Sequence, residues 1–100
     1  MTAQLESLAA AGIHIVPSEI ASHLIVERDG FVAFIERREH GLCNIGAPGL
    51  ATEQGFAALV WRGERAFFVG KGFEQPASEQ QVQDLRAFAN DLEKAVLGRG

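Results

Sequence analysis

Apolar residues in this chain follow two patterns, one typical of β-hairpins and one typical of amphipathic helices. Residues 23–38 place two apolar, β-branched and aromatic runs on either side of Asp29-Gly30. Asp-Gly readily adopts the positive φ values of a type I′ turn, so this segment is predicted to form a hairpin. Residues 55–71 repeat the pattern around Gly63-Glu64. We therefore expect four antiparallel strands, at residues 23–28, 31–38, 55–62 and 65–71.

The period changes near the end of the chain, where residues 78–98 carry apolar positions at helical spacing. Ser78 and Gln81 have the spacing of a capping box, in which each residue satisfies a backbone N–H of the other. Gly98 is a typical C-terminal stop for a helix. These features predict a long C-terminal helix.

A shorter helix is predicted at the start of the chain, between Thr2 and Gly12. Residues 13–16 lead in extended form into Pro17, either as a short edge strand or as a packed coil. The sequence thus predicts one α+β domain over residues 1–100, in the order α-β-β-β-β-α. In this domain a short N-terminal helix and a long C-terminal helix flank a four-stranded antiparallel sheet made of two hairpins.

The predicted strands do not alternate apolar and polar residues, as a sheet with one wet face would. Apolar residues are consecutive in each strand, at 24–26, 31–35, 56–61 and 66–69. Two helices, one of them short, either divide between the two faces of such a sheet or leave part of it for another copy to cover. Because two-fold dimers are the commonest oligomers, we expect a homodimer through the sheet face or edge.

Composition narrows the possible partners. The 100 residues are 47% hydrophobic and 22% charged, as in an ordinary globular domain, and the net charge is −4. A net negative chain is a poor binder of duplex nucleic acid, and a single strand stacked on the aromatic sheet would also need a positive groove. A signal-peptide pattern and a membrane-length apolar run are both missing, and Cys43 is the only cysteine. These features predict a cytoplasmic domain without membrane contact.

Two glycine-rich stretches raise the question of phosphate binding. Residues 41–46 space two glycines as in a phosphate-binding loop, but Ala47 and Pro48 occupy the positions that require Lys and Ser/Thr. Residues 70–75 follow a strand, but Gln75 stands where a dinucleotide fingerprint needs its third glycine. We therefore expect no cofactor.

Cys43 and His40 are the candidate nucleophile and base in the connection between the two hairpins. A thiol exposed near cationic groups is activated as a nucleophile. The competing and favoured interpretation is that Cys43 is a small apolar side chain that packs this connection onto the core. His40 and Cys43 make only half of a metal site, so no metal is expected.

The connection at residues 39–54 is far longer than a usual hairpin loop. In a four-stranded meander, both tight turns would lie at one end of the sheet and this connection at the other. Six side chains are then expected to gather around it: His23, Arg37, Arg38, His40, Cys43 and Lys71. Within this cluster a ligand site for an anionic group is predicted, held by Arg37, Arg38, His40 and Lys71.

The main functional hypothesis is a small, cytoplasmic, dimeric and non-enzymatic interaction or adaptor protein of chaperone-like type, with a protein partner. In architecture alone the chain is similar to small acidic dimeric α+β proteins that hold a partner polypeptide, such as bacterial secretion chaperones. The alternative is a protein that binds a small anionic ligand, or a Cys-dependent enzyme, with its site at the glycine-rich loop 39–54.

Overall fold

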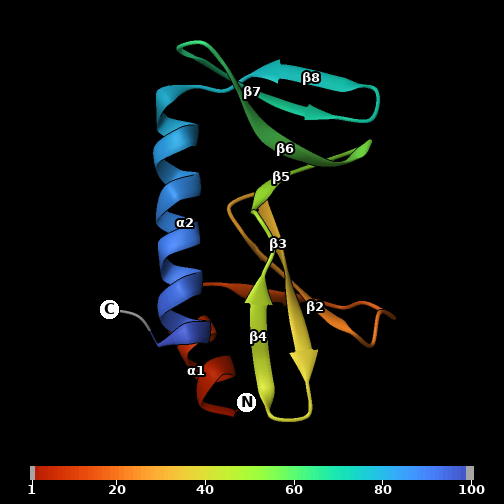
Figure 1. Cartoon of the computed structure of the whole chain (residues 1–100), viewed down its shortest axis with the longest axis vertical. Coiled ribbons are helices and arrows are strands. Elements are labelled where there is room, and N and C mark those ends of the chain that lie inside the picture. The colour runs from red at the N-terminus through yellow and green to blue at the C-terminus, as the bar shows by residue number, and fades with distance from the viewer. Residues whose placement is uncertain (1, 99–100) are drawn as a thin grey trace.

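The computed structural model describes residues 2–98 and shows two helices packed on one curled, eight-stranded antiparallel sheet (Figure 1). The helices are α1 (Thr2–Ala10) and α2 (Glu79–Leu97). The strands are β1 (His14–Val16), β2 (His23–Arg28), β3 (Phe31–Arg38), β4 (Gly41–Ile45), β5 (Gly49–Thr52), β6 (Gly55–Arg62), β7 (Arg65–Gly70) and β8 (Phe73–Pro76). Their order in the sheet is β1-β2-β3-β5-β6-β7-β8, and β4 pairs with β3 beside β5.

The expectation of a four-stranded sheet is wrong, because four further strands lie outside the two tight hairpins. The hairpins β2–β3 and β6–β7 and the two terminal helices are present where the sequence pattern places them. Asp29 and Gly30 have φ values of 55° and 88°, as the tight turn requires. The extra strands are β1 on the edge of β2, β8 on the edge of β7, and β4 and β5 within the long connection.

β4 and β5 lie along the same edge of β3 as one interrupted strand. β4 pairs with the far half of β3, and β5 pairs with its first two residues. Between them, Gly46 donates its backbone N–H to the Phe34 carbonyl oxygen at 2.8 Å. Pro48 follows, and it has no backbone N–H with which to continue the ladder. Most of the connection predicted at residues 39–54 is therefore strand.

This additional strand reverses the direction of the second hairpin. β5 stands between β3 and β6, so β6 runs parallel to β3 rather than antiparallel to it. The β6–β7 turn consequently lies toward the end of the sheet where β3 finishes. The register places Gly70 beside Ala57, and hence Lys71 toward the end where β3 begins. The two tight turns are at opposite ends of the sheet.

The sheet curls around a core on the side that α2 covers. Phe31 on β3 and Phe68 on β7 are three strands apart, which is about 14 Å in a flat sheet. Their ring centroids are nevertheless only 6.1 Å apart, so this inner face is concave. Phe88 of α2 is fully buried against it. Gly70 permits the curl, because a Cβ there would lie 2.6 Å from the carbonyl oxygen of Phe56.

The ends of α2 confirm the predicted capping. The Ser78 hydroxyl accepts the Gln81 backbone N–H at 3.0 Å, and the Gln81 side-chain oxygen accepts the Ser78 N–H at 2.9 Å. Gly98 ends the helix in the left-handed conformation with a φ of 69°. Within residues 2–98, neither helix is long and apolar enough to cross a membrane.

The side chain of Gln4 joins α1 to β4 and to the last turn of α2. Its amide nitrogen donates to the carbonyl oxygens of Leu42 at 3.0 Å and Val96 at 2.7 Å. Its amide oxygen accepts the backbone N–H of Leu42 at 3.0 Å. Gln4 thus gives Leu42 the two hydrogen bonds that a neighbouring strand would supply.

Arg28 makes a second connection, from β2 to α2 and to Ala11, which directly follows α1. Its guanidinium donates to the Asp91 carboxylate at 2.7 Å and to the Ala11 carbonyl oxygen at 2.9 Å. It also lies over the ring of Phe88, 5.5 Å from the centroid. Both helices are therefore held on the inner side of the sheet.

Candidate functional site

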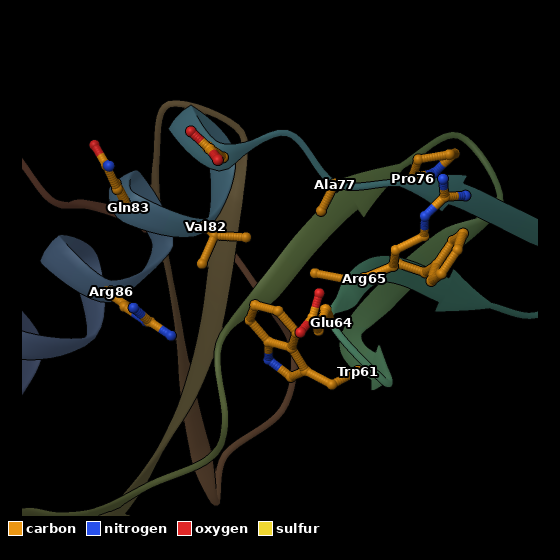
Figure 2. Close-up of a pocket in the computed structure, with 11 residues that line it drawn as sticks. Trp61, Glu64, Arg65, Pro76, Ala77, Val82, Gln83 and Arg86 are labelled. Carbon is orange, nitrogen blue, oxygen red and sulfur yellow. The ribbon is translucent and has the colours of Figure 1, made fainter.

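A groove of about 590 Å³ opens between the first half of α2 and the β6–β7 hairpin (Figure 2). This volume lies within the range of about 300–1,000 Å³ that is common for ligand-binding pockets. Val82, Gln83 and Arg86 line it from the helix side. Trp61 and Glu64 line it from the hairpin side, so the groove has one wall from each layer of the fold.

Trp61 is the main apolar side chain of this groove and the only tryptophan in the chain. It lies at the end of β6 beside Ala66 of β7, on the face of the sheet that turns toward α2. The helix does not cover it, and 49% of Trp61 is exposed, more than of any other large hydrophobic residue within 2–98. Exposed Trp and Arg side chains are enriched at the energetic centres of protein interfaces.

Arg86 is the cation of the helix wall. Figure 2 shows the side chains of Arg86 and Trp61 reaching toward each other from opposite walls, with Val82 between them. Within the part of the chain that the structure describes, Arg86 takes part in no ion pair. Glu79 lies on the same wall seven residues earlier, about 10 Å along the helix. The helix wall is therefore acidic at its start and basic farther along.

A second, smaller hollow of about 250 Å³ lies along the same helix, and Arg86 lines it too. Its other lining residues are all apolar: Ala47, Pro48, Ala58, Leu59, Leu85 and Ala89. Arg86 consequently stands between one hollow of mixed character and one apolar hollow.

The face of the sheet turned away from α2 carries a band of apolar side chains. Strand register aligns Val16 with Ile25 and Phe34 on β1–β3, and Val60 with Phe67 and Pro76 on β6–β8. Phe56 joins the two halves, and these seven residues are called the outer band below.

The two halves of the outer band meet across a glycine. The rings of Phe34 and Phe56 contact edge to face with their centroids 5.8 Å apart. They do so over Gly49, where a Cβ would lie 2.6 Å from the Phe56 ring. The Arg62 guanidinium covers part of the band, since it lies 5.0 Å from the Phe67 ring centroid and pairs with Glu74. Phe56 and Val60 remain 38% and 37% exposed.

The polar cluster predicted from the sequence is brought together in part. His23, Arg37, Arg38, His40 and Cys43 all lie toward the end of the sheet where β3 finishes. Lys71 does not join them, because it follows β7 at the opposite end. The strand formed by β4 and β5 is the reason, since the prediction assumed that residues 39–54 were a loop.

Arg38 forms an ion pair with Glu36, a residue that the sequence prediction did not include. The Glu36 carboxylate accepts two hydrogen bonds from Arg38, at 3.2 and 2.9 Å, and one from the Asn44 amide at 2.9 Å. The contact with Arg38, followed by that with Asn44, lowers the pKa of Glu36 to about 2. The same hydrogen bond raises the pKa of Arg38. The guanidinium of Arg37 is turned to the Ala21 carbonyl oxygen, at 3.0 and 3.2 Å.

The half-buried Cys43 faces the same carboxylate. Its thiol donates toward the Glu36 carbonyl oxygen at 3.5 Å and the carboxylate at 3.7 Å. Activated thiols lie among cationic groups, whereas the charged group in contact with this thiol is an anion. Among residues 2–98, His40 makes no side-chain hydrogen bond to Cys43, and no three His, Cys, Asp or Glu side chains gather as a metal site. The thiol therefore contacts Glu36 and not the imidazole that the sequence prediction paired with it.

The sequence prediction did not single out Trp61 or Arg86. A tryptophan at the end of a strand, directly before a charged turn, was the available signal, since its amphipathic ring is often found at interfaces. Arg86 gave no comparable signal, because its role depends on how far α2 stands from the hairpin.

Comparison with known proteins identifies no relative from which a function could be transferred. No protein-family model, curated protein or solved structure matches this chain. Function is therefore inferred from the surfaces and side chains described above.

Proposed function

We propose that this protein is a non-enzymatic interaction module of the adaptor or chaperone-like type, which works as a pair of identical copies joined through the outer band. The observation that carries the proposal is the exposure of Phe56 and Val60, at 38% and 37%, on a sheet face that neither helix covers. Contiguous exposed apolar surface of this kind marks interaction sites in folded proteins.

The free energy available from this face is modest for each residue and sizeable for the band. Full burial of a Val or Phe side chain stabilises by about 1.5–3 kcal/mol, so hiding the remaining third of Phe56 or Val60 contributes about 0.5–1 kcal/mol. Val16, Ile25 and Phe34 are also only partly buried and would add to this on both copies. Because a two-fold interface uses each patch twice, one band supplies several kcal/mol to a dimer.

The alternative of an anionic-ligand site or a Cys-dependent enzyme at loop 39–54 has less support. Two of the predicted ligand-binding cations already donate hydrogen bonds within the protein, Arg38 to Glu36 and Arg37 to the Ala21 carbonyl oxygen. The third, Lys71, lies at the other end of the sheet. Cys43 contacts the Glu36 carboxylate and not His40, the base that the sequence prediction assigned to it.

The test is sedimentation equilibrium of the full chain at tens of micromolar. We expect the wild-type protein to be a dimer and the Val60→Asp variant, which places a charge in the outer band, to be a monomer with unchanged far-UV circular dichroism. Leu97→Asp is the matched control, since Leu97 is similarly exposed, at 41%, but lies at the end of α2. A monomeric wild-type protein, or a Val60→Asp variant that stays dimeric, contradicts the proposal.

A further inference from the structure

The two hollows beside α2 form one elongated site. Glu79, Val82, Gln83, Arg86 and Ala89 line them from a single stripe of the helix, at the spacing of three and four residues that keeps side chains on one face. From Glu79 to Ala89 the helix rises by about 15 Å, which is the length of about five residues of an extended chain. The site therefore has the dimensions of a short peptide segment.

The chemistry of the site changes along its length. Trp61, Val82 and Ala77 offer a large apolar surface in the first hollow, while the second is lined by apolar side chains, Leu59 and Leu85 among them. Arg86 stands between the two, and its guanidinium can hold a carboxylate through two parallel N–H bonds. A ligand that fits all three parts has an apolar group, an anionic group and a second apolar group in that order.

We propose that this site binds an extended segment of a partner polypeptide in which one acidic residue stands between two apolar residues. Charge complementarity with Arg86 selects the acidic residue, and the two hollows take its apolar neighbours. A polypeptide suits the site because the groove is open and because polar side chains such as Gln83 and Glu64 at its walls can bond backbone amides. The part of the site between Trp61 and Arg86 lies on the side of the sheet that α2 covers, and one edge of the groove reaches Phe67 and Pro76 of the outer band.

The acidic residues of the groove limit the sequence further. Glu79 stands about two helical turns from Arg86, at the start of the helix wall. Glu64 lies in the β6–β7 turn on the facing wall. Arg65 follows Glu64 on this wall, so a second ligand carboxylate would be repelled beside Glu79 but attracted beside Arg65.

The test uses the full-length protein and three blocked five-residue peptides that differ only at the centre. Each carries leucine before and phenylalanine after a central aspartate, asparagine or lysine, and decanoate serves as a non-peptide probe of the same charge. Binding is followed by the emission of Trp61, which is the chain's only tryptophan and lies within the groove. Only the aspartate peptide can form a charge-assisted hydrogen bond with Arg86. We therefore expect it to bind about tenfold more tightly than the asparagine peptide, and the lysine peptide to bind most weakly.

Two variants test whether Arg86 causes the preference for the aspartate peptide. Arg86→Gln is expected to bind the aspartate and asparagine peptides equally. Arg62→Gln is the matched control, since Arg62 pairs with Glu74 away from Arg86, and it should keep the wild-type preference. The proposal is overturned if the lysine peptide binds as well as the aspartate peptide, if Arg86→Gln keeps the preference, or if no peptide binds at millimolar concentration. Tighter binding of decanoate than of every peptide also overturns it, in favour of a small amphiphile. Sedimentation of the same samples tests the dimer separately, so the two proposals fail independently.

Discussion

Replacing Gln4 tests whether one side chain holds α1, β4 and the end of α2 together. The Gln4→Met substitution keeps the length and approximate shape of the side chain but removes three hydrogen bonds, two to Leu42 and one to Val96. Leu42 is only 5% exposed, so its backbone N–H and carbonyl groups would not readily gain water in exchange.

The expected loss of stability follows from these three bonds. A net intramolecular hydrogen bond contributes about 0.5–1.5 kcal/mol, and a buried group left unpaired costs more. The free energy of unfolding should therefore fall by about 2–3 kcal/mol, a large part of the roughly 5–15 kcal/mol that stabilises a small domain. In a domain of this size, that loss lowers the melting temperature by roughly 10–20 °C.

Urea unfolding followed by far-UV circular dichroism measures the effect. Gln80→Met is the matched control, because the Gln80 amide bonds only to Asp84 on the exposed surface of α2. It should change the free energy of unfolding by less than about 0.5 kcal/mol. If Gln4→Met is no more costly than this control, Gln4 does not join the three elements and the reasoning fails.

Three further predictions concern the sheet and its charged contacts. Gly49→Ala should destabilise the protein by about 2–3 kcal/mol in urea unfolding, because its Cβ would meet the Phe56 ring at 2.6 Å. Gly46→Ala, whose nearest neighbour would be at 3.4 Å, should be nearly neutral, and equal losses would argue against the close packing at Gly49. Arg28→Ala should cost about 1–3 kcal/mol through its bonds to α2 and to Ala11 after α1, and a loss below about 0.5 kcal/mol would refute that role. Because the pKa of Glu36 is lowered from 4.5 to about 2, its stabilising contribution should be complete above pH 4.5 and disappear as the pH falls toward 2. Carboxyl NMR titration of Glu36 checks this, and a midpoint near 4.5 would contradict it.

Turns and helix ends could be predicted from the sequence, because they depend on residues that are close together in the chain. The Asp29-Gly30 turn and the Ser78 capping box are set by residues close in the chain, and both are present in the structure. β5 and β8 are four-residue strands, too short for a periodic pattern to separate them from loop. Their pairing depends on partners far along the chain, and the direction of the second hairpin depends on β5.

The candidate site was less predictable for the same reason. A cluster around Arg37 and Arg38 was a reasonable expectation, but Glu36 is on the same face of β3 as Arg38 and takes up its charge. Strand periodicity alone places Glu36 and Arg38 on one face, so this pairing was accessible from the sequence. The groove at Trp61 was not accessible from the sequence, because it arises from the distance between α2 and the β6–β7 hairpin.

The most direct test of the proposed dimer through the outer band is an isotope-filtered NMR experiment on a mixture of labelled and unlabelled protein. Nuclear Overhauser contacts observed in this way join atoms of two different copies. The account predicts such contacts between the methyl groups of Val60 in one copy and the aromatic rings of Phe34 or Phe56 in the other. Intermolecular contacts to α2 in place of these, or no intermolecular contacts in the concentrated sample, would contradict it.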